Sequence, residues 1–168
     1  ITRLVHSISP PLENRPLDEV EWDSFRLNFD VAVKSLYLVV RGIRQRDENS
    51  LRSVVSVSSS VTFGIPPKKM AAYVTAKHAL EGLCRVMAVE LAPAVRVNCV
   101  SPGFTPTPLT SNVDPRHYNI MSRSIPLERL GTVDDAAQAI MFLLGDQSSY
   151  ITGVTLPVAG GGAIRGSW

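Results

Sequence analysis

The chain has 168 residues, of which 45% are hydrophobic and 19% are charged, and its formal net charge is +2. This length indicates one domain, spanning residues 1–168. The charge is too small for a nucleic-acid-binding surface, and no apolar run is long enough to cross a membrane. No signal-peptide pattern opens the chain. Cys84 and Cys99 lie in apolar runs without metal-binding spacing, so we expect buried thiols, no metal site and a cytoplasmic protein.

The first third of the chain predicts two strands separated by one long helix. The short apolar segment from Arg3 to Ser7 is typical of a buried strand. Apolar residues then recur with a helical period from Trp22 to Gln45. The β-branched, alternating segment from Arg52 to Ser59 predicts the second strand.

The rest of the chain continues the alternation. Met70 to Ala92 predicts a long helix that is apolar on several faces, which is typical of a helix packed on more than one side. Val95 to Val100 and Val154 to Val158 predict two further strands. Three segments lie between these strands: a Pro/Thr-rich connection over 102–114, a short helix over 115–124, and a helix that runs from a cap at Thr132 to Leu144.

Alternating strands and helices predict βαβ units, and therefore an α/β fold with a parallel sheet. In such folds ligands bind outside the carboxyl ends of the strands. The segments that follow the predicted strands, and the helices between them, are therefore where a site is expected.

Tyr73 and Lys77 are the most informative pair in the chain. They are four residues apart in the predicted helix over 70–92, so they share one helix face. A free tyrosine has a pKa near 10. We expect the Lys77 ammonium to favour the phenolate and so to lower the pKa of Tyr73. Such a tyrosine could add or remove a proton at a carbonyl or alcohol oxygen, and a serine of the Ser58-Ser59-Ser60 cluster could hold that oxygen.

This segment resembles the active-site segment of the short-chain dehydrogenase/reductase family, and more of the chain follows the family pattern in order. The resemblance covers nearly all 168 residues. Its other elements are Asn28 in the long first helix, the strand and Pro-Gly turn of Arg96 to Gly103, Thr107, and the late pairs Thr152-Gly153 and Gly160-Gly161. The helical and late segments are similar to 3-oxoacyl-carrier-protein reductases and dicarbonyl/L-xylulose reductases.

The resemblance implies an NAD- or NADP-dependent oxidoreductase that interconverts a small ketone or aldehyde and an alcohol. Tyr73 would be the general acid or base, and Lys77 would assist it and reach the nicotinamide ribose. Ser60 would hold the substrate oxygen, because its spacing to Tyr73 matches the family, and Asn28 would hold a water for a proton relay. Pro102, Gly103 and Thr107 would face the nicotinamide. A homo-oligomer, dimer or tetramer, would form through the two long helices.

The chain also departs from the family pattern. Family members begin with a strand, a Gly-x-x-x-Gly-x-Gly turn and a helix, and no such turn occurs here. We therefore expect the C-terminal portion of a doubly wound, Rossmann-like domain without its first βαβαβ part. The chain begins at Ile1, so it could be a fragment, a processed product or a subunit of something larger.

Two alternative functions remain open at this point. His6 to Ser9 replaces the family's Asn-Asn-Ala-Gly and is similar to enoyl-acyl-carrier-protein reductases, a divergent branch. The missing phosphate-binding turn instead favours a non-catalytic or regulatory subunit of a hetero-oligomer. His6, His78 and His117 belong to no catalytic pattern, and we expect structural or surface roles for them.

Overall fold

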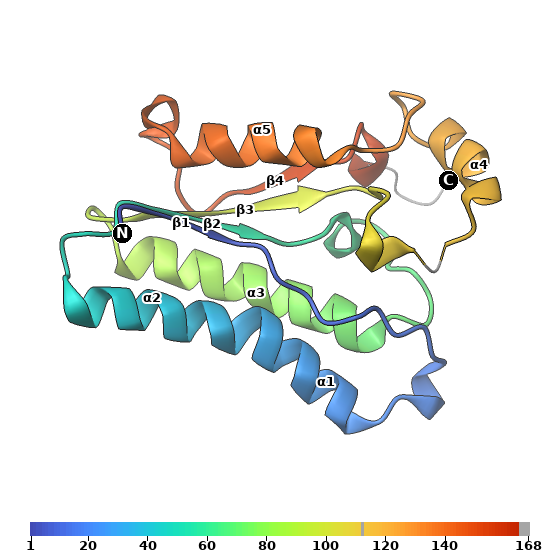
Figure 1. The fold of residues 1–168 in the computed structure, drawn as a ribbon, viewed down its shortest axis with the longest axis horizontal. Coiled ribbons are helices and arrows are strands. Elements are labelled where there is room, and N and C mark those ends of the chain that lie inside the picture. Colours follow the sequence, from blue (N-terminus) through green and yellow to red (C-terminus); the bar gives the residue numbers. More distant parts are fainter. Residues whose placement is uncertain (112, 165–168) are drawn as a thin grey trace.

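The computed structural model describes residues 1–111 and 113–164, and its centre is a four-stranded parallel sheet (Figure 1). The predicted parallel α/β fold is confirmed. The strands lie in chain order across the sheet and begin and end within two residues of the predicted positions. They are β1 (Arg3–His6), β2 (Ser53–Val57), β3 (Arg96–Pro102) and β4 (Thr155–Val158).

Helices cover both faces of this sheet. One face packs against α2 (Ser35–Arg46) and α3 (Ala71–Glu90), with α1 (Trp22–Phe29) running on beside α3 (Figure 1). The opposite face packs against α5 (Val133–Leu144), which begins at the predicted cap. There the Thr132 Oγ1 accepts a hydrogen bond from the backbone N–H of Asp135 at 3.2 Å. The short helix α4 (Tyr118–Arg123) lies near the carboxyl ends of the strands.

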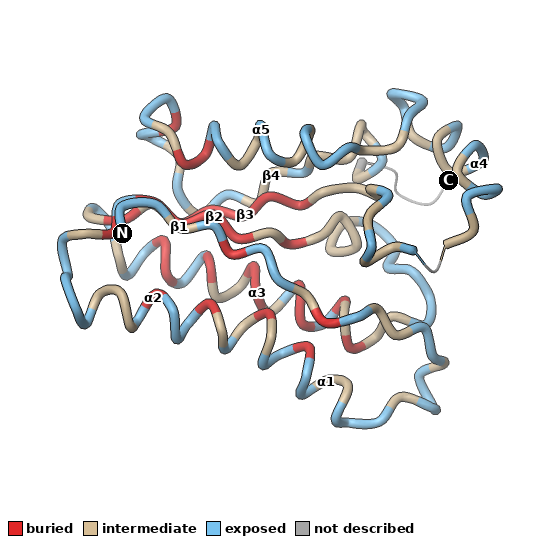
Figure 2. The backbone as a smooth tube through the Cα atoms, viewed as in Figure 1, coloured by how far each residue is buried: buried red, intermediate tan, exposed pale blue. Residues whose placement is uncertain are grey.

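The two faces of the sheet give two hydrophobic cores. Neighbouring residues of a strand point to opposite faces, so Val54 and Val55 enter different cores, and both are fully buried. The larger core lies between the sheet and α2 and α3, where Leu36 and Leu80 are fully buried. The smaller core joins Val55 to Leu143 of α5. Figure 2 shows the buried residues along the sheet and on the inner sides of α2 and α3.

The prediction that the first strand is buried is wrong. Arg3 and Val5 of β1 are exposed, and His6 is its only buried residue. β1 pairs with β2 on one side, and among the described residues no strand pairs with its other side. β1 is therefore an edge strand in this structure, because a strand needs neighbours on both sides to be fully covered.

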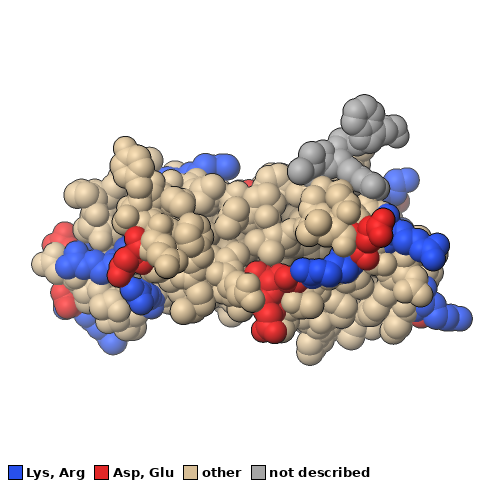
Figure 3. Space-filling model, turned by 90° about the horizontal axis from the view of Figure 1, so that it is seen from above, with Lys and Arg blue, Asp and Glu red and all other residues tan. Residues whose placement is uncertain are grey.

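Figure 3 looks onto the face of the molecule that α5 covers. Lys, Arg, Asp and Glu side chains lie toward both ends of this face and also near its middle, and uncharged side chains fill the rest. Among the residues described, no helix combines the length and apolar character that a membrane span would need.

Candidate active site

The carboxyl ends of three strands meet at one edge of the sheet. The strand register pairs His6 of β1 with Ser56, and Val57 of β2 with Val100 of β3. Strands β1, β2 and β3 therefore all deliver their following segments to this edge, where ligands bind in parallel sheets. The N-terminal half of α3 runs beneath this edge and carries the Tyr73–Lys77 pair.

Lys77 is the best-fixed side chain of the predicted pair. It is only 3% exposed, and its Nζ donates a hydrogen bond to the backbone oxygen of Val57 at 2.9 Å. The same Nζ lies 5.5 Å from the centroid of the Tyr73 ring. An ammonium has three donors. Because one of them is directed at Val57, two remain for other partners at the strand ends.

The expected lowering of the Tyr73 pKa is not found in this structure. Burial raises the pKa of Tyr73, and a side-chain hydrogen bond with Ser59 lowers it only in part. Burial also lowers the pKa of Lys77 to about 8. The prediction was wrong because it counted the charge of Lys77 and left out the cost of removing both groups from water.

The serine that contacts Tyr73 in this structure is Ser59. Its backbone is extended at the end of β2, and its hydroxyl accepts a hydrogen bond from the backbone N–H of Val61 at 3.4 Å. Hydrogen bonding with this side chain is also what partly offsets the rise of the Tyr73 pKa. The predicted Ser60 is half-buried and begins a 3-10 turn, Ser60–Thr62. No side-chain hydrogen bond of Ser60 is seen within residues 1–111 and 113–164. Strand alternation is a signal that distinguishes adjacent serines, since neighbours in a strand face opposite ways.

Asn28 lies where a helix changes geometry. The predicted single helix is continuous, but residues Asp30–Lys34, between α1 and α2, form a π-helical stretch. Asn28 is buried, and its Nδ2 donates to the backbone oxygen of Ser24 at 2.9 Å. A π-helical stretch often marks a functional site. α1 packs against α3, so Asn28 lies in the layer that carries Tyr73 and Lys77.

The Pro102-Gly103 turn closes β3 against the end of β4. The N–H of Gly103 donates to the oxygen of Val158 at 2.9 Å. A Cβ on Gly103 would lie 3.0 Å from the Cα of Ala159, so only glycine fits without a shift of the backbone. Thr107 precedes a 3-10 turn, Pro108–Thr110, and its backbone N–H donates to the Thr110 hydroxyl oxygen at 2.9 Å.

His6 belongs to a buried network that the sequence pattern did not reveal. Its Nε2 lies 2.8 Å from the Ser35 hydroxyl, and its Nδ1 lies 3.2 Å from the Ser56 hydroxyl. The Ser35 hydroxyl donates to the oxygen of Val31, so it must accept from His6. These contacts select the neutral tautomer that carries its proton on Nε2. Burial, and then the charge of Lys77, lower the pKa of His6.

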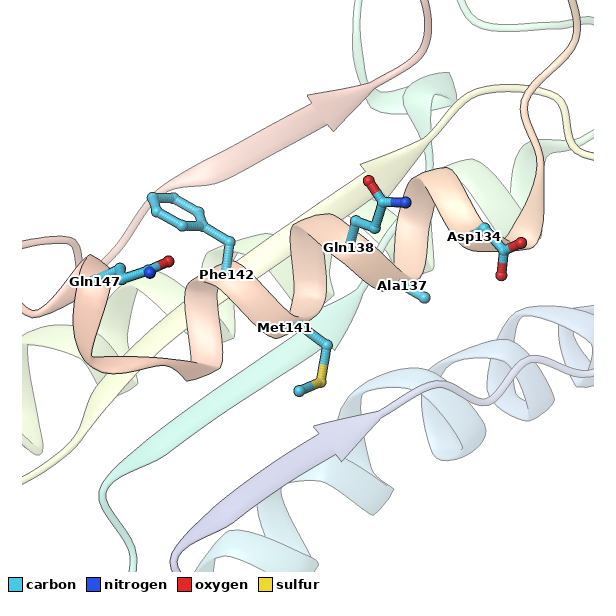
Figure 4. Close-up of a pocket in the computed structure, with 6 residues that line it drawn as sticks. All are labelled: Asp134, Ala137, Gln138, Met141, Phe142 and Gln147. Atoms are coloured by element: carbon cyan, nitrogen blue, oxygen red, sulfur yellow. The ribbon is translucent and has the colours of Figure 1, made fainter.

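A separate hollow lies on the outer side of α5 (Figure 4). It has a volume of about 440 Å³ and is open to solvent, and Asp134 is the only ionisable residue among the described residues that line it. The labelled side chains in Figure 4 come from α5 and the turn that follows it. None of the predicted site residues lines this hollow, so we place the candidate site at the strand ends.

Comparison with known proteins shows the family to which the chain belongs. A family model described as enoyl-(acyl carrier protein) reductase matches residues 1–162. A short-chain dehydrogenase/reductase, SDRA of Arabidopsis thaliana, is 42% identical over 136 residues, which cover 79% of this chain and 52% of the relative. The chain belongs to the short-chain dehydrogenase/reductase family.

Other members of the short-chain dehydrogenase/reductase family show the same similarity. The tropinone reductase-like 3 of Erythroxylum coca is 50% identical over 113 residues, which cover 65% of this chain and 43% of the relative. The structure of a 3-ketoacyl-(acyl-carrier-protein) reductase from Brucella melitensis, complexed with NADH, superposes with a TM-score of 0.85 at 29% identity. That match covers 97% of this chain and 68% of the other. The chain thus spans about half the length of these curated relatives.

Proposed function

We propose that the protein is a nicotinamide-dependent carbonyl reductase or alcohol dehydrogenase in which Tyr73 transfers the proton. The observation that carries this proposal is the Tyr73–Lys77 pair at the carboxyl edge of the sheet, with the Lys77 Nζ 5.5 Å from the Tyr73 ring centroid. Family membership supports the same chemistry, because relatives are named as dehydrogenases and reductases.

In reduction, the substrate oxygen would accept hydrogen bonds from Tyr73 and from the serine beside it. Bound NADH or NADPH supplies the hydride that reaches the carbonyl carbon. As the carbonyl carbon is reduced, the Tyr73 hydroxyl donates its proton to the oxygen, and an alcohol results. Because burial raises the pKa of Tyr73, the phenol stays protonated at neutral pH, which suits a proton donor.

The described residues fit a nicotinamide nucleotide at this edge. Two donors of Lys77 are free to meet ribose hydroxyls, and the close packing of Gly103 on Ala159 gives a narrow turn at the end of β3. Pro102, Gly103 and Thr107 are the residues we propose to face the nicotinamide. Asn28 would hold a water at the kink between α1 and the π-helical stretch.

Tyr73→Phe in the complete protein is the decisive test. We expect turnover of a panel of ketones and aldehydes, with NADH or NADPH, to fall about a hundredfold or more, because general acid catalysis contributes that much. The loss of reduced-nicotinamide absorbance measures the rate. Tyr150→Phe is the matched control, since Tyr150 is fully exposed and is none of the predicted site residues. A Tyr73→Phe protein that keeps wild-type activity would refute the assignment.

The same assay separates the alternatives. The description of the matching family model favours an enoyl reductase as a second candidate. An enoyl thioester in the panel tests it: reduction of the C=C bond with no reduction of any ketone would favour this function. If the unmutated complete protein turns over no substrate of the panel, the result would favour the non-catalytic subunit instead.

A homo-oligomer through the long helices remains part of the proposal. Leu27 and Phe29 of α1, Leu38 of α2, and Val86 and Val89 of α3 are all exposed. Exposed apolar faces on adjacent helices are typical of protein–protein contacts. The cytoplasmic location is likewise a proposal from the sequence.

A further inference from the structure

One buried charge beside the candidate site has no part in the reaction proposed above. Glu81 lies one turn after Lys77 on α3 and is only 6% exposed. Removing a carboxylate from water is costly unless hydrogen bonds replace the lost hydration. The partners of Glu81 therefore indicate what the side chain holds in place.

A single oxygen of Glu81 receives three hydroxyl groups. Ser58 donates to the Oε1 at 2.6 Å, Thr62 at 2.8 Å and Ser101 at 3.3 Å. Ser58 follows β2, Thr62 closes the 3-10 turn after it, and Ser101 is near the end of β3. One carboxylate thus connects α3 to the carboxyl ends of both central strands.

These contacts bracket Ser59 on both sides. Before it, the oxygen of Val57 accepts from Lys77 at 2.9 Å, and Ser58 is bound to Glu81. After it, the backbone N–H of Thr62 donates to the backbone oxygen of Ser59 at 3.2 Å, while the Thr62 hydroxyl donates to Glu81. The backbone of Ser59 is therefore tied to the same helix that carries Tyr73.

We propose that Glu81 is a positioning residue that acts through Ser58 and Thr62 to hold the Ser59 hydroxyl against Tyr73. This inference rests on the proposed function of Tyr73. The carboxylate also stabilises the ammonium form of Lys77, since its charge partly opposes the lowering of the Lys77 pKa by burial.

A double-mutant cycle on Glu81 and Ser59 tests this positioning role. Because the Ser59 hydrogen bond lowers the pKa of Tyr73, Ser59→Ala should raise that pKa. The loss of the Glu81 charge would by itself favour the phenolate and lower the pKa of Tyr73, so a rise in Glu81→Gln reports the displacement of Ser59. If Glu81 acts through Ser59, Glu81→Gln should add little in the Ser59→Ala background. NMR titration of Tyr73 in 13C-tyrosine-labelled protein measures each pKa without requiring activity.

In the active enzyme, Glu81→Gln should also lower kcat about 10- to 100-fold, because misplaced groups cost that much.

Two further variants keep the outcomes distinct. Glu90→Gln makes the same change at an exposed position of α3 and should leave the pKa of Tyr73 unchanged. If Glu81→Gln does not fold, Ser58→Ala removes one hydroxyl and should give a smaller shift in the same direction. Fully additive shifts, or an unshifted Tyr73 in Glu81→Gln or in its replacement Ser58→Ala, would overturn the inference. The double-mutant cycle could give the expected pKa shifts while the wild-type protein turns over no substrate. That result would support the positioning of Ser59 by Glu81 and refute the proposed reaction.

Discussion

At the scale of single residues, burial decides the charge state of the site more than neighbouring charges do. Tyr73, Lys77 and His6 each have a pKa displaced toward the neutral form, and burial is the largest cause in all three. Such displaced pKa values are suited to moving a proton, because none of the three groups is held permanently in its charged form.

His6 makes this burial testable through acid unfolding. Its pKa is lower in the folded protein than the usual value of about 6.5, so protonation favours the unfolded chain. The His6 contribution to stability should be fully present above that usual value and should be lost as pH falls toward the folded pKa. Urea unfolding at a series of pH values measures the loss.

The variant His6→Gln should flatten this acid dependence, because glutamine keeps a donor and an acceptor but does not titrate in that range. His117→Gln changes an exposed histidine and should leave the dependence as in the wild type. An equally steep acid loss in His6→Gln would show that another group is responsible.

At the scale of elements, the end of β2 decides which way each of the three adjacent serines faces. The strand is parallel and buried up to Ser56, so its register against β1 and β3 sets the direction of each side chain that follows. Ser58 reaches Glu81 and Ser59 reaches Tyr73, while Ser60 already belongs to the 3-10 turn.

Replacing the two serines separately tests this order. Ser59→Ala should lower kcat by about 10²- to 10³-fold, as the loss of one donor to a developing oxyanion does. Ser60→Ala should leave kcat near the wild-type value and serves as the matched control. Steady-state kinetics with one reactive ketone measures both. The reverse order of effects would restore Ser60 as the residue that holds the substrate oxygen.

At the scale of the whole molecule, the chain exposes apolar side chains on α1, α2 and α3 although other apolar side chains of these helices are buried in the larger core. Val89 is 80% exposed and Val86 is 52% exposed, and both lie on α3. A helix that packs on the sheet with one side and carries valines on another is typical of a subunit contact.

Charging this face should separate the subunits. We expect Val89→Lys to shift the protein toward a smaller species, because a buried ammonium without a partner is costly. Light scattering after size-exclusion chromatography measures the mass. Val133→Lys, on the opposite face of the sheet and also exposed, is the control and should leave the mass unchanged. An unchanged mass in Val89→Lys would refute the proposed interface.

Much of this architecture is predictable from the sequence, because strands and helices are encoded by local patterns. The period of apolar residues locates the long helices, and β-branched runs locate the four strands. The four-residue spacing of Tyr73 and Lys77 is enough to predict that both lie on one helix face. The same spacing separates Lys77 from Glu81, but a lone glutamate in a helix most often faces solvent, so the pattern does not single it out.

Several site properties were decided only by the tertiary structure. The three hydroxyls on Glu81 and the contacts of His6 join residues that are far apart in the chain. Such contacts depend on how strands align and how a helix crosses them, which no local pattern specifies. The pKa directions of Tyr73 and Lys77 depend on the removal of water, and burial exists only once the sheet and its helices have packed together.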